Sequence, residues 1–145
     1  MSAATTIKHV ITPNDVDTII SSWVTAKTLA SPEVSGTERM SAVSLFFDPG
    51  KGHERHNHSA SEQLIYVLAG AGEMMIEDET GLPVTTAISA GSLVTIPRGA
   101  FHSTFNTGWE PLRILAVYSP TGPEAAMRNS AEFTVLAPGV VPGKV

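Results

Sequence analysis

The chain has 145 residues, of which 42% are hydrophobic and 16% charged, a composition that excludes a disordered protein and suits one domain with a buried core. Nine basic residues against 14 acidic ones give a net charge of −5, and without a basic cluster we expect neither nucleic-acid nor membrane binding. The absence of cysteine excludes disulfides, cysteine-zinc sites and thiol catalysis.

The N-terminal segment carries no targeting signal that the sequence reveals. Residues 1–10 lack both a basic cluster and a continuous apolar core, so we expect no signal peptide. No apolar run approaches the roughly 20 residues of a membrane helix. These observations predict a cytoplasmic protein.

Residues 13–22 support two interpretations. Thr12 as a possible N-cap, followed by Pro13, favours a short helix. Three consecutive β-branched residues at positions 18–20 favour a strand that begins at Asp17 instead. Both alternatives remain open from the sequence.

Short apolar stretches, separated by glycine and proline, run through the middle of the chain. Glycine and proline weaken or break helices, so stretches of about five residues between them predict strands. The predicted strands cover residues 40–47, 64–68, 73–77, 84–88, 92–96 and 113–118. The sequence Asp-Glu-Thr-Gly at 78–81 predicts a hairpin turn in which Gly81 takes a positive φ, and Pro123 is followed by a possible helical turn at 124–128. The pattern favours a β-sandwich or small barrel.

Two histidine motifs carry the functional signal. In the first, Gly50 is followed after five residues by His56-x-His58; residues two apart on a strand point to one face, where both imidazoles can offer a nitrogen to one cation. The second motif places His102 shortly after the Pro97-x-Gly99 turn. Together they predict a metal site built from three imidazoles.

These motifs resemble those of the cupin family. The matching positions are Gly50, His56, His58 and Gly70 in the first motif and Gly91, Pro97, Gly99, His102 and Asn106 in the second. The resemblance implies an all-β fold, the cupin double-stranded β-helix or jelly-roll barrel, over residues 39–120. Residues 1–38 would then form an N-terminal arm or extra strands, and 121–145 a C-terminal extension.

The resemblance also implies that one divalent transition metal ion binds to His56, His58, His102 and a fourth residue. Counting back six residues from Gly70 gives Gln63, where the family has glutamate. Glu62 is the rival, because it keeps a permitted spacing from His58. The metal could be Mn, Fe, Ni, Zn or Cu, since imidazole and amide ligands accept most of these ions.

Further residues receive candidate roles around this site. Glu62 and Tyr66 could move protons, and Arg55 and Arg98 could orient an anionic substrate through bidentate contacts or remain solvated turn cations. The pocket walls would include Phe47 and Phe101. His53 is a rim residue or a base near the ligands.

Three functions are compatible with such a site. A neutral three-histidine and glutamine set predicts a metal-dependent lyase or isomerase acting on a small polar molecule with a carbonyl or carboxylate group, as in small cupins that open or isomerise unsaturated sugar acids. Glutamate as the fourth ligand would favour a dioxygenase that uses O2. The third is a non-catalytic module that binds a small molecule. The resemblance also implies a homodimer.

Overall fold

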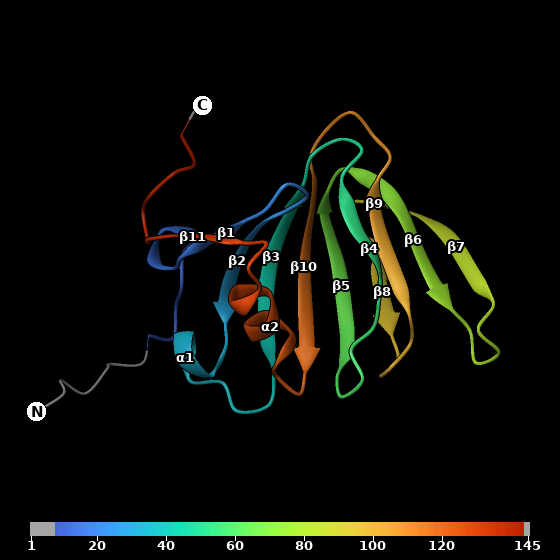
Figure 1. The fold of residues 1–145 in the computed structure, drawn as a ribbon, viewed down its shortest axis with the longest axis horizontal. Helices are drawn as coiled ribbons and strands as arrows, with labels where there is room; N and C mark the ends of the chain where they lie inside the picture. The colour runs from blue at the N-terminus through green and yellow to red at the C-terminus, as the bar shows by residue number, and fades with distance from the viewer. Residues whose placement is uncertain (1–7, 144–145) are drawn as a thin grey trace, which may run out of the picture.

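The computed structural model describes residues 8–143, which form two antiparallel sheets packed face to face (Figure 1). The large sheet contains, in spatial order, β11 (Thr134–Leu136), β1 (Thr18–Ile20), β2 (Thr25–Ala30), β3 (Ser41–Phe47), β10 (Leu112–Ser119), β5 (Glu62–Ala69) and β8 (Leu93–Ile96). The small sheet contains β4 (Gly52–His56), β9 (His102–Asn106), β6 (Ala71–Glu77) and β7 (Pro83–Ser89). This architecture confirms the predicted all-β jelly-roll class.

All six predicted strands of the middle region are present, with bounds that differ by at most two residues. Of the two alternatives for residues 13–22, the strand is correct: a single 3-10 turn, η1 (Pro13–Asp15), precedes β1. The helical turn predicted after Pro123 is α2 (Pro123–Asn129), and α1 (Pro32–Ser35) is a further short helix. Within residues 8–143, no helix has the length and apolar character needed to cross a membrane.

The two chain extensions meet at one edge of the large sheet. Strand β1 pairs with β2 on one side and with β11 on the other, so residues near both ends of the chain lie side by side. Residues 1–7 of the predicted arm, together with residues 144–145 of the predicted C-terminal extension, lie outside the described residues. The expectation of no signal peptide therefore falls mostly on residues outside the description.

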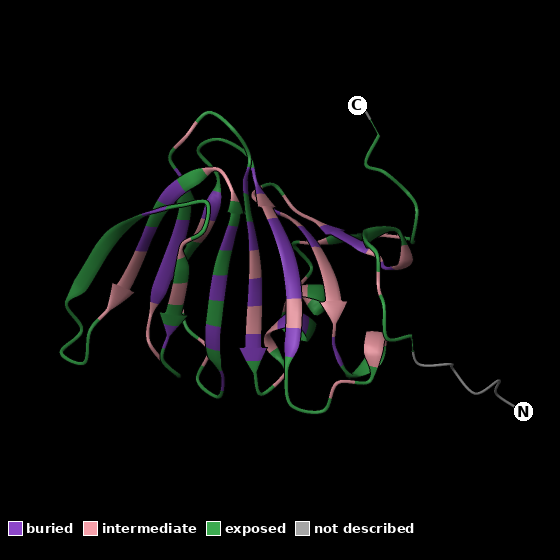
Figure 2. Cartoon of the chain, turned by 180° about the vertical axis from the view of Figure 1, so that it is seen from behind, coloured by how far each residue is buried: buried purple, intermediate pink, exposed green. Residues whose placement is uncertain are grey.

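The core fills the space between the two sheets. Along β5 and β10 buried residues alternate with exposed or half-buried ones, which is visible as alternating colours in Figure 2. Ile65 and Ile114 from the large sheet face Met74 of the small sheet, and each of these side chains is at most 2% exposed. Period-2 alternation thus decides which side chains reach the interior, including those of the site.

Asn106, the last residue of β9, stabilises one end of the barrel. Its buried amide group donates hydrogen bonds to the carbonyls of Phe47 (2.9 Å) and Glu110 (2.7 Å), and its Oδ1 accepts one from the Gly108 N–H (2.9 Å). Alanine would leave all three backbone groups without this partner. We expect Asn106→Ala to lower the free energy of unfolding by about 2–4 kcal/mol in urea titrations. Replacement of the exposed Asn14 should have no effect, and equal stability of the two variants would contradict this role.

Candidate metal centre

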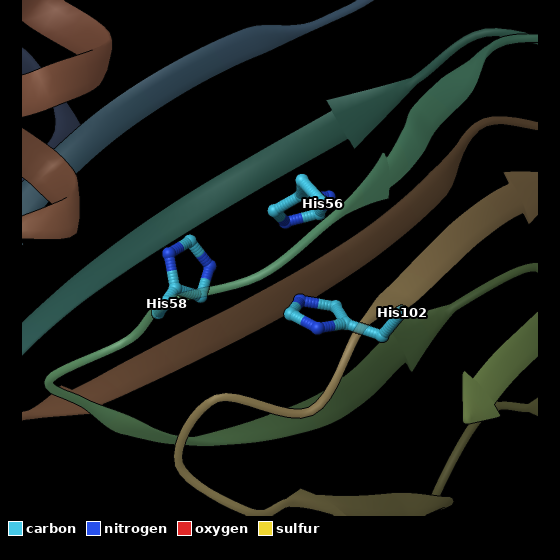
Figure 3. Close-up of side chains that lie close together, drawn as sticks. All are labelled: His56, His58 and His102. Carbon is cyan, nitrogen blue, oxygen red and sulfur yellow. The ribbon is translucent and has the colours of Figure 1, made fainter. Parts of the chain in front are cut away.

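Three histidines from separate parts of the chain meet between the sheets. His56 ends β4, His58 lies two residues beyond that strand, and His102 begins β9. One nitrogen from each ring lies within 4.8 Å of the nitrogens of the other two, and Figure 3 shows the three rings turned toward a common space. The antiparallel pairing of β4 with β9 places His56 directly opposite His102. The structure therefore brings together the three predicted histidines.

An irregularity in β4 shapes this cluster. His53 is paired with Thr104 and His56 with His102, so β4 has one more residue than β9 between the two pairs. This extra residue, a β-bulge, turns both His53 and His56 to the inner side although they are three apart. Their rings stack at 3.5 Å between centroids. Gly52 begins β4 at a point where the backbones of β4 and β9 lie too close for a side chain, since a Cβ there would lie 2.1 Å from the Thr104 carbonyl oxygen.

Backbone carbonyls fix the orientation of two of the rings. The Nδ1–H of His56 donates to the Glu54 carbonyl at 2.6 Å, and the Nδ1–H of His102 donates to the Ala100 carbonyl at 2.9 Å. Each ring then keeps the lone pair of Nε2 for another partner. The Nε2 atoms of His58 and His102 are buried without a hydrogen-bond partner. Buried polar atoms normally have partners, so these nitrogens are free to bind an ion.

Two loops that carry the histidines are joined to each other. The Gly99 N–H donates to the carbonyl of His58 at 2.9 Å, and the Asn57 side-chain amide donates to the Gly99 carbonyl at 3.2 Å. Gly99 has φ +80°, a conformation that glycine adopts without strain. The Pro97-x-Gly99 turn thus holds His58, which lies outside a strand, next to the start of β9.

Residues 62 and 63 lie on opposite faces of β5. Gln63 is 4% exposed and belongs to the inward-facing row with Ile65, whereas Glu62 is exposed on the outer face. Gln63 pairs with Tyr118 of β10, whose ring contacts that of His58 at 5.2 Å between centroids. The Oε1 atom of Gln63 is also buried without a hydrogen-bond partner.

These donors fit a divalent transition metal. Burial lowers the pKa of His53 to about 3 and the pKa values of His56 and His58 to about 4, and it also lowers the pKa of His102; the neighbouring imidazoles add to the effect for all four. Neutral imidazoles are the form that binds metal ions. The metal-binding group found among the described residues contains histidines and no carboxylate. An ion held there would keep most of its charge.

The low histidine pKa values predict a pH-dependent stability of the metal-free protein. In the unfolded chain these histidines take up protons below their ordinary pKa of 6.5, whereas in the folded protein they remain neutral down to about pH 4. The unfolded state therefore binds more protons between these limits, so stability must fall as the pH decreases from about 6.5 to 4.

We expect the melting temperature of the EDTA-treated protein to decrease steadily over this range. The measurement is a series of thermal melts in one buffer system. In a His56→Ala, His58→Ala double variant the melting temperature should depend less on pH. An unchanged pH dependence would contradict its origin in these histidines.

The structure does not bring the other predicted residues to the histidines. Arg55 pairs with Glu77 through two contacts of 2.7 and 3.1 Å and covers the ring of Phe101 at 3.8 Å, outside the barrel. Arg98 is exposed in a loop. Arg55 lines a cavity of about 490 Å³ together with His53 and His56, but its guanidinium is already engaged by Glu77, and Phe101 packs against that ion pair.

Three further candidates also lie elsewhere. Phe47 is 1% exposed and belongs to the core rather than to a pocket wall. Glu62 and Tyr66 share the outer face of β5, where Tyr66 is 43% exposed. Because residues an even number apart on a strand face the same side, neither can reach the interior while Gln63 does. Their predicted catalytic roles receive no support from this geometry.

Sequence reasoning missed the residues that border the open side of the centre. A pocket of about 270 Å³ next to His56 and His58 is bordered by Trp23, which precedes β2, and by Met127 and Phe133 from α2 and the segment after it. Helix α2 is anchored there by Glu124, which accepts a hydrogen bond from Ser41 at 2.7 Å. No motif connects these residues, so only the fold reveals them.

Known proteins resemble this chain in sequence and in fold. Residues 44–118 match the sequence model of the Cupin domain family. The chain is 29% identical over 100 residues to the putative germin-like protein 9-2 of Oryza sativa subsp. japonica, covering 69% of this chain and 47% of the relative. It is 32% identical over 74 residues to a glucose-6-phosphate isomerase of Thermococcus gammatolerans, covering 51% and 38% of the two chains.

Among solved structures, the oxalate decarboxylase of Bacillus subtilis, studied for its Mn(II) centres, superimposes with a TM-score of 0.73 at 22% identity. The match covers 85% of this chain and 32% of the decarboxylase. The chain thus spans about half the length, or less, of the curated relatives named here and a third of this structural neighbour.

Proposed function

The chain belongs to the cupin family, and from this premise we propose that it is a metal-dependent lyase or isomerase acting on a small molecule with a carbonyl or carboxylate oxygen. One observation carries the proposal: the Nε2 atoms of His58 and His102 and the Oε1 atom of Gln63 can each bind a metal ion through a lone pair, and all three are buried without a hydrogen-bond partner. Donors of this kind fit one divalent ion of the first transition row. Mn, Fe, Ni, Zn and Cu are the candidates.

We propose Gln63 as the fourth ligand. It lies on the inner face of β5, and its strand neighbour Tyr118 contacts the ring of His58. Its side chain is uncharged, so together with three neutral imidazoles it leaves the charge of the ion undiminished. Such an ion acts as a Lewis acid that polarises a carbonyl or carboxylate oxygen.

The protein supplies the positions of the ligands and controls the protonation state of the groups around them. Carbonyls of residues 54 and 100 hold the rings of His56 and His102 in the tautomer that directs Nε2 inward. Tyr118 is fully buried beside His58, and burial raises the pKa of its hydroxyl, so it stays protonated at neutral pH. It can therefore donate a hydrogen bond but cannot serve as a base at that pH.

The names of the relatives are consistent with this chemistry. Oxalate decarboxylase and glucose-6-phosphate isomerase act on molecules with carboxylate or carbonyl oxygens, and the decarboxylase has Mn(II) centres. These relatives support a reaction class and not a particular substrate for this chain.

The test combines metal analysis with an oxygen-controlled assay. Protein purified without chelator is analysed for metal, stripped, reloaded with each candidate ion, and incubated anaerobically with a panel of carbonyl and carboxylate compounds followed by NMR. We expect turnover that depends on the added ion and proceeds without O2. Turnover that occurs only with O2 consumption would replace this proposal with a dioxygenase.

A further inference from the structure

Two pockets border the histidine cluster, and the one that touches both His56 and His58 indicates which molecules reach the centre. It lies between His56 and His58 on one side and α2 with the following segment on the other, and its volume is about 270 Å³, near the lower end for small-molecule sites. The side chains that decide its character are those of Trp23, His53, Tyr118, Met127, Glu132 and Phe133. A ligand in this pocket would be small.

Aromatic rings form the walls of the pocket. The indole of Trp23 stacks on His53 at 4.4 Å and meets Phe133 edge-on at 5.7 Å between centroids. The His53 ring in turn stacks on His56. A column of flat rings therefore leads from the pocket wall to a metal ligand. Flat apolar groups pack well against such surfaces.

The pocket offers little to bind a highly charged or hydroxyl-rich molecule. Among the described residues that line it there is no lysine or arginine, and the carboxylate of Glu132 already accepts a hydrogen bond from the Trp23 indole at 2.5 Å. Two further polar side chains line it, and both already have backbone partners: Asn57 donates to the Gly99 carbonyl, and the Ser130 hydroxyl accepts from the Glu132 N–H. The arginines of the surrounding elements are paired, Arg55 with Glu77 and Arg128 with Asp17. A second anionic group or several hydroxyls would lose water without gaining partners, which costs affinity.

We propose that the substrate is a small planar, mainly apolar molecule with one anionic oxygen group, of the aromatic or α,β-unsaturated monocarboxylate class. The oxygen group would face the three metal-binding histidines, and the planar body would lie against Trp23 and Phe133. This inference rests on the proposed metal centre. It replaces the small polar molecule expected from the sequence with a molecule that keeps one carboxylate but has an apolar body.

The test uses the Co2+-loaded protein in a Trp109→Phe background, which makes Trp23 the sole tryptophan. Azide, acetate, benzoate, malonate and glucuronate are titrated while the visible cobalt spectrum and the Trp23 fluorescence are recorded. We expect benzoate to bind about tenfold more tightly than acetate, with a change in Trp23 fluorescence. Malonate and glucuronate should bind no more tightly than acetate.

Variants of Phe133 locate the planar body. Phe133→Ala should weaken benzoate about three- to tenfold and leave acetate unchanged, and Phe133→Leu, which keeps apolar volume, should lie between. Phe105→Ala is the matched control, since Phe105 is 37% exposed on β9 and does not line this pocket. Equal melting temperatures verify that the variants fold.

Two outcomes are informative in different ways. If azide changes the cobalt spectrum but benzoate binds no better than acetate, or malonate or glucuronate binds better, the substrate class is wrong and the metal centre stands. If Co2+ gives no spectrum typical of histidine ligands, the proposed function fails and this inference fails with it.

Discussion

Replacing His102 with alanine is expected to abolish stoichiometric metal binding. His102 is 1% exposed, its ring is held by the Ala100 carbonyl, and its buried Nε2 has no hydrogen-bond partner. Loss of a residue that merely orients a ligand reduces metal affinity about 10–100-fold, and loss of a ligand itself should cost more. Metal analysis of protein purified without chelator would show the original chain loaded and the variant empty.

Thermal melts provide a second measurement of the same effect. An ion present at about 100 times its dissociation constant stabilises the folded state by about 2.7 kcal/mol, which raises the melting temperature of a chain of this size by about 5–10 °C. The original protein should show this increase, and His102→Ala should not. Stoichiometric metal in the variant, or the same increase in melting temperature, would rule out the centre.

Two further variants separate metal binding from folding. His58→Ala removes a ligand from a loop rather than from a strand, so it should lose metal with less effect on the stability of the metal-free protein. His9→Ala is the matched control because His9 is exposed and distant in sequence from both motifs. It should bind metal like the original chain.

The sequence was sufficient to predict the three histidines because local spacing determines their positions. The His-x-His spacing and the Pro97-x-Gly99 turn act over a few residues, so each motif positions its own histidines, and the pairing of β4 with β9 then places His56 opposite His102. The bulge that turns His53 inward was not predictable, since it depends on the register between two strands and not on either strand alone.

Consecutive residues of a strand face opposite sides, which explains why the sequence left two candidates for the fourth ligand. A turn separates His58 from β5, and the number of residues in that turn decides whether position 62 or 63 faces inward. The sequence does not specify the turn geometry, so Glu62 and Gln63 remained alternatives. The structure begins β5 at Glu62 with its side chain outward, and Gln63 follows on the inner face.

The pocket wall depends on contacts between distant parts of the chain. The indole N–H of Trp23 donates to Glu132, 109 residues away, and α2 reaches the site because Glu124 is anchored to Ser41 of β3. Neither contact leaves a pattern in the sequence. The homodimer, the domain bounds and the cytoplasmic location stay predictions.

The substitution Gln63→Glu is expected to lower the melting temperature of the metal-free protein but to increase the stabilisation that bound metal provides. Gln63→Glu places a carboxylate where the side chain is 4% exposed and its Oε1 has no partner. An unpaired buried charge costs about 2–4 kcal/mol, so the EDTA-treated variant should melt roughly 5–15 °C lower at pH 7.5. Burial raises the pKa of such a carboxyl, so the difference should shrink toward pH 5.

Metal should reverse this loss if Gln63 faces the ion. A carboxylate ligand attracts a divalent cation more strongly than an amide oxygen, so the added ion should raise the melting temperature of Gln63→Glu more than that of the original chain. Glu62→Gln is the matched control, because Glu62 is exposed on the opposite face of β5. It should change neither the metal-free melting temperature nor its response to metal. If Glu62→Gln alone lost metal, Glu62 would be the ligand and the orientation of β5 would have to be revised.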